Sequence, residues 1–330
     1  INATIDCLES FGCRVKRSGS GDVVVEPFAK NNPVPTAQFD FKDSATSARF
    51  SMALAAAFGI KASCRGSYYL TKRHMLPLTR RMALRGLNMT SFSLPLEMQG
   101  RLEAGYYQFR GDEGSQFISA LLLVLPLLLA DSEIELSSPL IDSSFVDITV
   151  DTLKRFGITV EKTEKGYHVP GRQIYVSPGE LETENDWGLA SAWVCGAALG
   201  RAKGGKLSVT GLAKKTVQNY QDLQILTSLL EQDFTDLTVD MSPWPDLVPL
   251  VAAAAALKGA HAVLTGAPQL KTKETNRLKV TAECIRSLGG RAVPSEDGIE
   301  VWGPANGVFD ENTVLDCMGD PWVFISFALS

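Results

Sequence analysis

The sequence predicts an α/β fold assembled from copies of one βαβαββ module. An acidic residue, a small polar cluster and a run of small apolar residues recur five times in its 330 residues. The copies open at Asp43, Asp112, Asp186, Asp246 and Asp320. Because these aspartates lie about 60 to 75 residues apart, they indicate duplication of a whole supersecondary unit. Alternating helical and extended segments within each copy place the chain in the α/β class.

The first half of each copy predicts a buried helix followed by a short strand. The helices are expected at residues 53–59, 120–130 and 250–259, where nearly every position is small or apolar. A helix that is apolar on all sides must be buried. The strands are expected at residues 134–136, 207–209 and 262–264.

The second half of each copy predicts an amphipathic helix and a β-hairpin. The helices, at residues 150–156 and 277–288, are each followed by glycine, a common helix stop. The hairpins pair residues 158–162 with 166–169 and 291–294 with 298–302. Asp297-Gly298 in the second hairpin is a strong turn signal.

Both ends of the chain fall within a module. Residues 1–12 have the pattern of a second helix and 23–25 that of its hairpin strand, whereas 323–330 have the pattern of a first helix. We therefore expect four complete modules and two halves, in a fragment of a longer protein.

Composition narrows the class of protein. A chain of 330 residues exceeds what one core usually supports, so two domains are expected. The longest apolar run, residues 118–130, is shorter than the roughly 20 residues that cross a bilayer. Six scattered cysteines without a C-x-x-C pair indicate reduced thiols and a cytoplasmic location, and three histidines offer little for a zinc site. A net charge of −5 argues against nucleic acid as a partner.

The segment from Lys271 to Arg277 is the sharpest cluster of charge. On a helix, Lys273 and Arg277 would share one face with Glu274 beside them, and a carboxylate between two cations can move protons. The same pattern fits a helix start with a threonine cap and a solvated ion-pair face. Spacing alone leaves both interpretations open.

A family resemblance accompanies this segment. Residues 270–278, Leu-Lys-Thr-Lys-Glu-Thr-Asn-Arg-Leu, resemble the Leu-Arg-x-Lys-Glu-Ser/Thr-Asp-Arg-Leu signature of the 5-enolpyruvylshikimate-3-phosphate synthase (3-phosphoshikimate 1-carboxyvinyltransferase) family. Five further motifs follow the family's order, at residues 43–49 (Asn-x-Gly-Thr-x-x-Arg), 73–75 (Arg-Pro-Met/Ile), 114–117 (Ser-Ser-Gln-Phe), 145–149 (Tyr-Ile/Val-Asp-Met/Ile-Thr) and 245–246 (Pro-Asp). The resemblance covers essentially the whole chain.

The resemblance implies two similar domains of three modules each, with the active site in the cleft between them. The first domain would span residues 1–184 without its N-terminal part, and the second 185–330 without its C-terminal part. The implied reaction transfers the enolpyruvyl group of phosphoenolpyruvate to the 5-hydroxyl of shikimate 3-phosphate, on the route to chorismate and the aromatic amino acids. It implies a monomer that needs no metal or organic cofactor, with no membrane or nucleic-acid partner.

The resemblance also assigns site residues. Asp246 and Lys273 would bind and activate the attacking hydroxyl, and Glu274 would transfer the proton at the methylene carbon. Substrate binding falls to Asp43, Thr46, Arg49, Arg73, Gly114, Ser115, Gln116, Asp142, Gln269 and Arg277, of which the two arginines Arg73 and Arg277 would hold phosphoenolpyruvate.

Three of these residues have a structural alternative. Ser115 could cap the helix that follows it, Asp246 could do the same after Pro245, and Arg73 could be an ordinary surface residue.

Several positions depart from the family pattern. Asp43 stands where the family has asparagine, and a carboxylate facing an anionic substrate would repel it. Four further positions differ from the family residue: Ala45, Gly114, Phe145 and Gln269. In addition, Gly319-Asp320-Pro321-Trp322 stands where the family has Asp-His-Arg. Neither Pro321 nor Trp322 can replace the arginine's charge.

Three interpretations follow. The chain is a working synthase, or it is a homologue that has lost catalysis and binds phosphoshikimate or another protein. A relative such as UDP-N-acetylglucosamine enolpyruvyl transferase or RNA-terminal phosphate cyclase fits less well, because no cysteine follows the appropriate loop, no histidine nucleophile is evident, and the acidic charge balance disfavours RNA.

Overall fold

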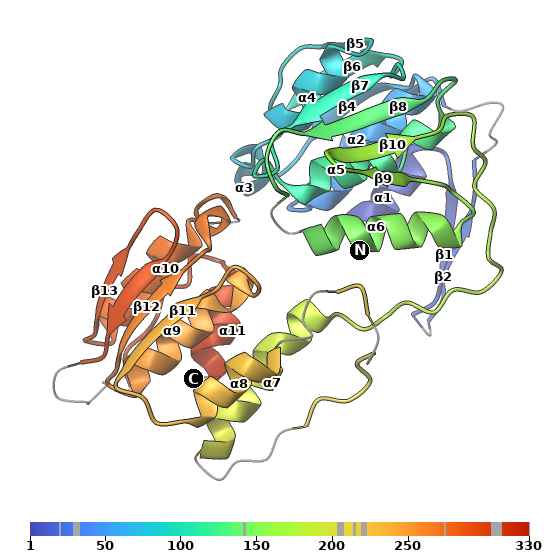
Figure 1. Cartoon of the computed structure of the whole chain (residues 1–330). Helices are drawn as coiled ribbons and strands as arrows, with labels where there is room; N and C mark the ends of the chain where they lie inside the picture. Colours follow the sequence, from blue (N-terminus) through green and yellow to red (C-terminus); the bar gives the residue numbers. More distant parts are fainter. Residues whose placement is uncertain are drawn as a thin grey trace. The chain divides into compact units, whose positions relative to one another are not determined.

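The chain folds into two compact units, Ile1–Leu181 and Glu182–Ser330. The computed structural model describes residues 1–19, 21–28, 34–140, 143–202, 208–213, 216–218, 223–273, 275–304 and 312–329. In Figure 1 the first unit runs from blue to green and the second from yellow to red. In the described residues, no helix is long and apolar enough to cross a membrane.

The first complete module gives the architecture that the others repeat. It contains β3 (Thr36–Asp40), α2 (Ala45–Phe58), β4 (Lys61–Arg65), α3 (Tyr68–Thr71), α4 (Leu76–Ala83), β5 (Leu87–Met89) and β6 (Leu96–Gly100). The sheet order is β3-β4-β6-β5. The β3 and β4 strands are parallel and need the crossover helix α2, whereas β5 and β6 form an antiparallel hairpin that adds to β4.

Two further modules have the same order. One consists of β7 (Tyr106–Phe109), α5 (Ser115–Leu122), η1 (Leu125–Leu127), β8 (Ser132–Leu136), α6 (Ser143–Arg155), β9 (Glu161–Thr163) and β10 (Gly166–Val169). The other consists of β11 (Asp236–Asp240), η2 (Pro245–Leu247), α9 (Val248–Leu257), β12 (His261–Thr265), η3 (Pro268–Thr272), α10 (Arg277–Ser287), β13 (Arg291–Pro294) and β14 (Ile299–Trp302). Their sheets, β7-β8-β10-β9 and β11-β12-β14-β13, confirm the predicted α/β class and its βαβαββ module.

The remaining elements lie outside these three sheets. The first unit begins with α1 (Asn2–Ser10) and the hairpin of β1 (Arg14–Arg17) and β2 (Val23–Glu26). The second unit contains α7 (Trp187–Ala202), α8 (Leu223–Glu231) and α11 (Pro321–Leu329).

The strand predicted at residues 207–209 is wrong where it can be compared. Leu207 lies outside the described residues, and Ser208 and Val209 are not in a strand. In the residues after Val209, two backbone carbonyls accept hydrogen bonds from side chains. Asn185 Nδ2 donates to the Gly211 oxygen at 2.7 Å, and Trp187 Nε1 donates to the Ala213 oxygen at 3.0 Å. Among the described residues, this copy therefore consists of two helices without a sheet.

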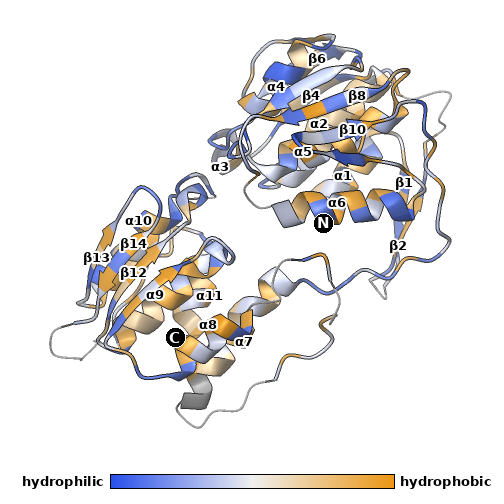
Figure 2. Ribbon diagram, viewed as in Figure 1, coloured by the Kyte–Doolittle hydropathy of each residue, from blue (hydrophilic) through white to orange (hydrophobic). Residues whose placement is uncertain are grey.

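The small-residue helices are buried, as predicted. In α9 every residue except Leu257 is buried, and Figure 2 colours this helix in apolar shades. In α2 the Ser44 hydroxyl accepts from the backbone N–H of Ser47 at 3.2 Å, and Gly59 ends the helix in the left-handed conformation. The cap and the glycine fix both ends of a helix that forms the core of its unit.

The helix predicted at residues 120–130 is shorter than expected. The α5 helix ends at Leu122, and a 3₁₀ turn follows at Leu125–Leu127. Pro126 explains the difference, because its ring lacks an N–H and would clash with the carbonyl four residues earlier, at Leu122.

In two of the modules a glycine lies at the start of the last strand for a steric reason, Gly166 as the first residue of β10 and Gly298 directly before β14. A Cβ atom on Gly298 would lie 1.8 Å from the Leu264 carbonyl oxygen, and one on Gly166 would lie 1.9 Å from that of Ile134. Both carbonyls belong to the adjacent strand of the sheet, so they cannot move aside without disturbing the ladder.

We therefore expect Gly298→Ala to destabilise the second unit by at least about 2 kcal/mol, because backbone atoms would have to separate. Urea unfolding measures the loss. Gly19→Ala is the control, since a Cβ atom there would have no neighbour within 4 Å. Equal stability of the two variants would contradict the steric argument.

His261 lies between two carboxylates on the surface of the second unit's sheet. Its Nδ1 lies 2.9 Å from Asp236 Oδ2 and its Nε2 lies 2.9 Å from Glu300 Oε1. The hydrogen bond with Asp236, followed by that with Glu300, raises the pKa of His261. A raised pKa means that the folded protein binds the proton more tightly than the unfolded chain does.

The stabilisation from His261 is thus fully present below the unfolded pKa of about 6.5 and is lost as pH rises through the higher folded value. We expect the wild type to exceed His261→Gln in unfolding free energy by under about 1 kcal/mol at acidic pH, because the site is partly exposed. The difference should shrink by pH 9. A difference between the two melting curves that does not change with pH would contradict this.

Candidate functional site

A buried arginine organises the polar cluster of the second unit. Arg277, the first residue of α10, is 1% exposed. Its Nε donates to Asp320 at 3.2 Å from Oδ1 and 3.0 Å from Oδ2, and its Nη1 donates to Asp246 Oδ1 at 2.6 Å. Two carboxylates from different elements thus bind one guanidinium group. Charge-assisted bonds of this kind are about twice as strong as neutral ones.

Asp246 joins a second cation to this cluster. It lies in η2, directly before α9, and its Oδ1 lies 3.7 Å from Lys273 Nζ. Both ion pairs of Asp246 use Oδ1, and within the described residues its Oδ2 forms no hydrogen bond. Asp246 does not cap α9, whose start has no side-chain cap, so the capping alternative is wrong. One carboxylate oxygen therefore remains for a ligand.

The prediction that Lys273 and Arg277 share a helical face is wrong. Lys273 follows η3 in an extended conformation, and α10 begins only after Asn276, whose side chain accepts from the Lys279 N–H at 3.1 Å. The alternative of a threonine cap and a solvated ion-pair face is wrong too, because asparagine caps the helix and Arg277 is buried. The two cations meet at Asp246 through a bend in the chain.

The motif comparison did not select Asp320 as a site residue. This carboxylate is fully buried, and Thr275 Oγ1 donates to its Oδ2 at 2.9 Å. Its Oδ1 also accepts from the backbone N–H groups of Trp322 and Val323 at 3.0 and 3.2 Å, at the start of α11. In the sequence, Asp320 opens a copy and lies in residues 319–322, the segment that stands where the family has Asp-His-Arg.

Two buried polar atoms near these segments have no hydrogen-bond partner in the part of the chain that the structure describes. They are the Gln269 Oε1 in η3 and the indole Nε1 of Trp244, which precedes Pro245. Unpaired buried groups are rare and mark places where a ligand or water binds.

Of the predicted residues, Glu274 and Asp142 lie outside the described part of the chain.

The first unit gathers its predicted residues around Arg49 of α2. Arg49 is 6% exposed and donates from Nη1 to Gln116 Oε1 on α5. Its Nη2 donates to the His74 carbonyl at 3.1 Å, and its guanidinium lies 4.4 Å from the centre of the Phe117 ring. Arg49 therefore joins the motif of α2 to that of α5 and to the residue next to Arg73.

The start of α5 offers donors to an anion. Gly114 is the N-cap residue with φ 122°, and no side chain caps this helix. Ser115 is the first helical residue, so the prediction that it might serve as the cap is wrong. It is buried, and its hydroxyl forms no hydrogen bond with the described residues. A helix N-terminus with an unoccupied hydroxyl suits a phosphate group.

The other predicted residues of the first unit are less tightly placed. Asp43 accepts a hydrogen bond from the Ser67 hydroxyl, which occupies one of its carboxylate oxygens. Thr46 is exposed on the first turn of α2, and Arg73 is half-buried between α3 and α4.

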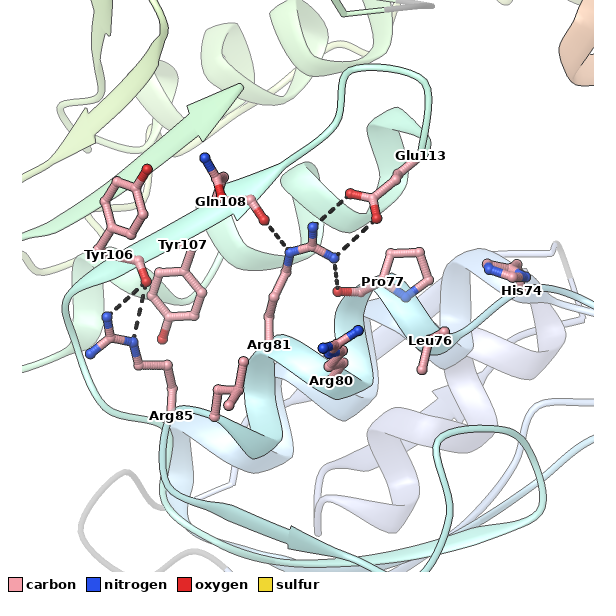
Figure 3. Close-up of a pocket in the computed structure, with 11 residues that line it drawn as sticks. His74, Leu76, Pro77, Arg80, Arg81, Arg85, Tyr106, Tyr107, Gln108 and Glu113 are labelled. Carbon is pink, nitrogen blue, oxygen red and sulfur yellow. Dashed lines mark hydrogen bonds and ion pairs between the residues drawn. The ribbon is translucent and has the colours of Figure 1, made fainter. Parts of the chain in front are cut away.

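A separate pocket of about 390 Å³ lies against α4 of the first unit (Figure 3). Arg81 donates to the Pro77 carbonyl at 2.7 Å and forms an ion pair with Glu113 at 2.7 Å. Arg85 donates to the Tyr106 carbonyl at 2.8 Å. None of the predicted site residues lines this pocket, although His74, whose carbonyl accepts from Arg49, does.

Metal-ligand groups do not gather in the described ranges, where no three His, Cys, Asp or Glu side chains lie close enough to hold an ion.

Comparison with known proteins gives the same family as the sequence motifs. The family EPSP synthase (3-phosphoshikimate 1-carboxyvinyltransferase) matches residues 1–330. The chain belongs to the EPSP synthase family. A 3-phosphoshikimate 1-carboxyvinyltransferase of Methanocorpusculum labreanum is 31% identical over 92% of this chain and 75% of its own length. One from Clostridium kluyveri is 28% identical over 93% of this chain and 74% of its own length.

Solved structures support the fold of an EPSP synthase. The EPSP synthase of Acinetobacter baumannii matches with a TM-score of 0.65 at 18% identity, covering 99% of this chain and 80% of that one. At that identity the match supports the fold alone. The chain spans about three quarters of the length of the two curated relatives.

Because Arg277 neutralises the buried carboxylate of Asp320 and the partly buried one of Asp246, we expect Arg277→Met to destabilise the second unit by about 3–5 kcal/mol. The double variant Arg277→Met/Asp320→Asn should recover part of this loss, since the buried carboxylate is then uncharged. Denaturant unfolding of the two single variants and the double variant gives the coupling. Strictly additive losses would show that the pair is not coupled.

Proposed function

We propose that this chain transfers the enolpyruvyl group of phosphoenolpyruvate to the 5-hydroxyl of shikimate 3-phosphate, the EPSP synthase step of the shikimate pathway. Family membership over residues 1–330 supports this. The observation that carries the proposal at atomic detail is the cluster of Lys273, Asp246 and Arg277, which forms at the segment that resembles the family signature.

The second unit supplies the groups that the addition step needs. The Asp246 Oδ2, which has no partner among the described residues, would accept the proton of the 5-hydroxyl, and Lys273 would stabilise the oxygen as it attacks C2 of the enol. Glu274 would deliver a proton to the methylene carbon. The same carbon then loses a proton as phosphate leaves and the double bond re-forms.

Cations hold the acidic groups of phosphoenolpyruvate. In the second unit, Arg277 would bind these groups, because guanidinium groups pair with carboxylate and phosphate in bidentate geometry. The Asp246 and Asp320 carboxylates already fix the Arg277 side chain. Little side-chain freedom is therefore lost when the ligand binds.

The first unit would hold shikimate 3-phosphate. No side chain caps α5, so the backbone N–H groups of its first turn can donate to the phosphate group. The Ser115 hydroxyl, which forms no hydrogen bond with the described residues, could donate to the same group. Gln116, which Arg49 orients, and Thr46 would contact the same substrate. The Ser67 hydroxyl donates to Asp43 and occupies one of its oxygens, but the negative charge stays at that position.

Lys273→Met tests the proposal. We expect the variant to lose phosphate release by at least about 100-fold in kcat, because the cation acts as the charge develops, while the fold persists. The measurement is phosphate release from phosphoenolpyruvate with shikimate 3-phosphate. Lys279→Met is the matched control, since Lys279 is exposed on the next turn and forms no ion pair among the described residues.

Three outcomes separate the interpretations. Activity in the wild type and in Lys279→Met, but not in Lys273→Met, supports the proposal. Wild-type binding of shikimate 3-phosphate in calorimetry without phosphate release would instead favour the binding homologue. Full activity of Lys273→Met would remove the role assigned to that lysine.

A further inference from the structure

We infer that Asp320 is a positioning residue that holds Arg277 in the orientation needed to bind phosphoenolpyruvate. The inference rests on the proposed function and deepens it, because it names the group that sets the geometry of a substrate-binding cation. No motif assigned this role to Asp320.

The contacts of Asp320 exceed those of an ordinary helix cap. Capping α11 needs one oxygen, and Oδ1 supplies it by accepting from Trp322 and Val323. Oδ2 instead faces Arg277 Nε at 3.0 Å and Thr275 Oγ1 at 2.9 Å. A cap alone does not explain a second oxygen placed between a buried guanidinium group and a hydroxyl.

The two carboxylates of the cluster take different parts of Arg277. Asp320 binds Nε, close to the stem of the side chain, whereas Asp246 binds Nη1 at its end. Two anchors fix the plane of the guanidinium group, because rotation about the side chain would break one of them. The ring of Trp322 lies 6.0 Å from the Arg277 Cζ, on the same segment that Asp320 caps.

This division leaves Asp246 able to act on substrate. Asp246 uses Oδ1 for both cations and keeps Oδ2 without a partner in the described residues. If Asp320 lost its charge, Asp246 would be the carboxylate left on Arg277 among the described residues, and it would pair with two cations. Asp320 therefore acts through Arg277 and Asp246 without touching the reacting atoms.

Burial makes the arrangement consequential. Asp320 is fully buried and Arg277 is 1% exposed, so solvent cannot replace either partner. A buried charge that loses its partner is strongly penalised, which gives Asp320 control of the Arg277 conformation.

Asp320→Asn is the discriminating variant, because asparagine caps helices as well as aspartate does but carries no charge. We expect the KM for phosphoenolpyruvate to rise by about tenfold or more while the KM for shikimate 3-phosphate changes by less than about twofold. Ile285→Val is the control for stability. It removes one buried methyl group from α10, the helix that begins with Arg277, and changes no polar group of the cluster.

A second variant covers the case in which Asp320→Asn does not fold. Thr275→Val removes only the hydroxyl that donates to Asp320 Oδ2 and keeps the shape and all the charges. We expect a rise of about two- to fivefold in the KM for phosphoenolpyruvate, because Oδ2 loses one of its two fixed donors.

A readout independent of turnover is the Nε–H resonance of Arg277 in arginine-labelled protein. It should be protected from exchange in the wild type and in Ile285→Val, and exchange rapidly in Asp320→Asn. If the wild type is inactive, the proposed function fails and this signal still tests Asp320.

The outcomes are decisive. A selective rise in the KM for phosphoenolpyruvate, with loss of the protected signal, supports the inference. The inference is overturned if folded Asp320→Asn keeps the wild-type KM for phosphoenolpyruvate, or if the KM values for both substrates rise equally in Asp320→Asn and in Ile285→Val. If Asp320→Asn does not fold, an unchanged KM for phosphoenolpyruvate in Thr275→Val overturns it.

Discussion

The second unit's site depends on one buried guanidinium group bound by two carboxylates. Arg277 joins η2 through Asp246 and the start of α11 through Asp320, so three segments far apart in sequence meet at one side chain. Burying these charges separately would cost several kcal/mol each, and only their mutual pairing makes the arrangement stable. The geometry that anchors the fold locally is therefore the same geometry that would orient a cation toward the proposed substrate.

Most of the fold could be predicted because its signals are local. The small apolar residues of α2 and α9 predict buried helices from the residues of each helix alone. In the same way, Asp297-Gly298 predicts a hairpin turn from two adjacent residues. The failures have local or side-chain causes. Pro126 stops α5 at Leu122, and the side chain of Asn185 binds the carbonyl of Gly211 near the expected strand.

The site was only partly predictable, and for a different reason. Residues that the motifs assigned to the site lie together within each unit, since Arg49 binds Gln116 and Lys273 pairs with Asp246. A helical spacing was nevertheless assumed for Lys273 and Arg277, although Asn276 begins the helix between them. Asp320 was missed because it reaches Arg277 across 43 residues, and no period or spacing in one sequence reports a contact of that range.

The cluster at Arg277 has a further consequence for how an anion reaches it. Its described members are two cations, Lys273 and Arg277, and two carboxylates, Asp246 and Asp320, so their formal charges cancel. A neutral cluster projects little field beyond a Debye length of about 8–10 Å. Long-range electrostatic steering by these four residues is thus weak, and they would hold an anion at contact distance, where added salt screens poorly.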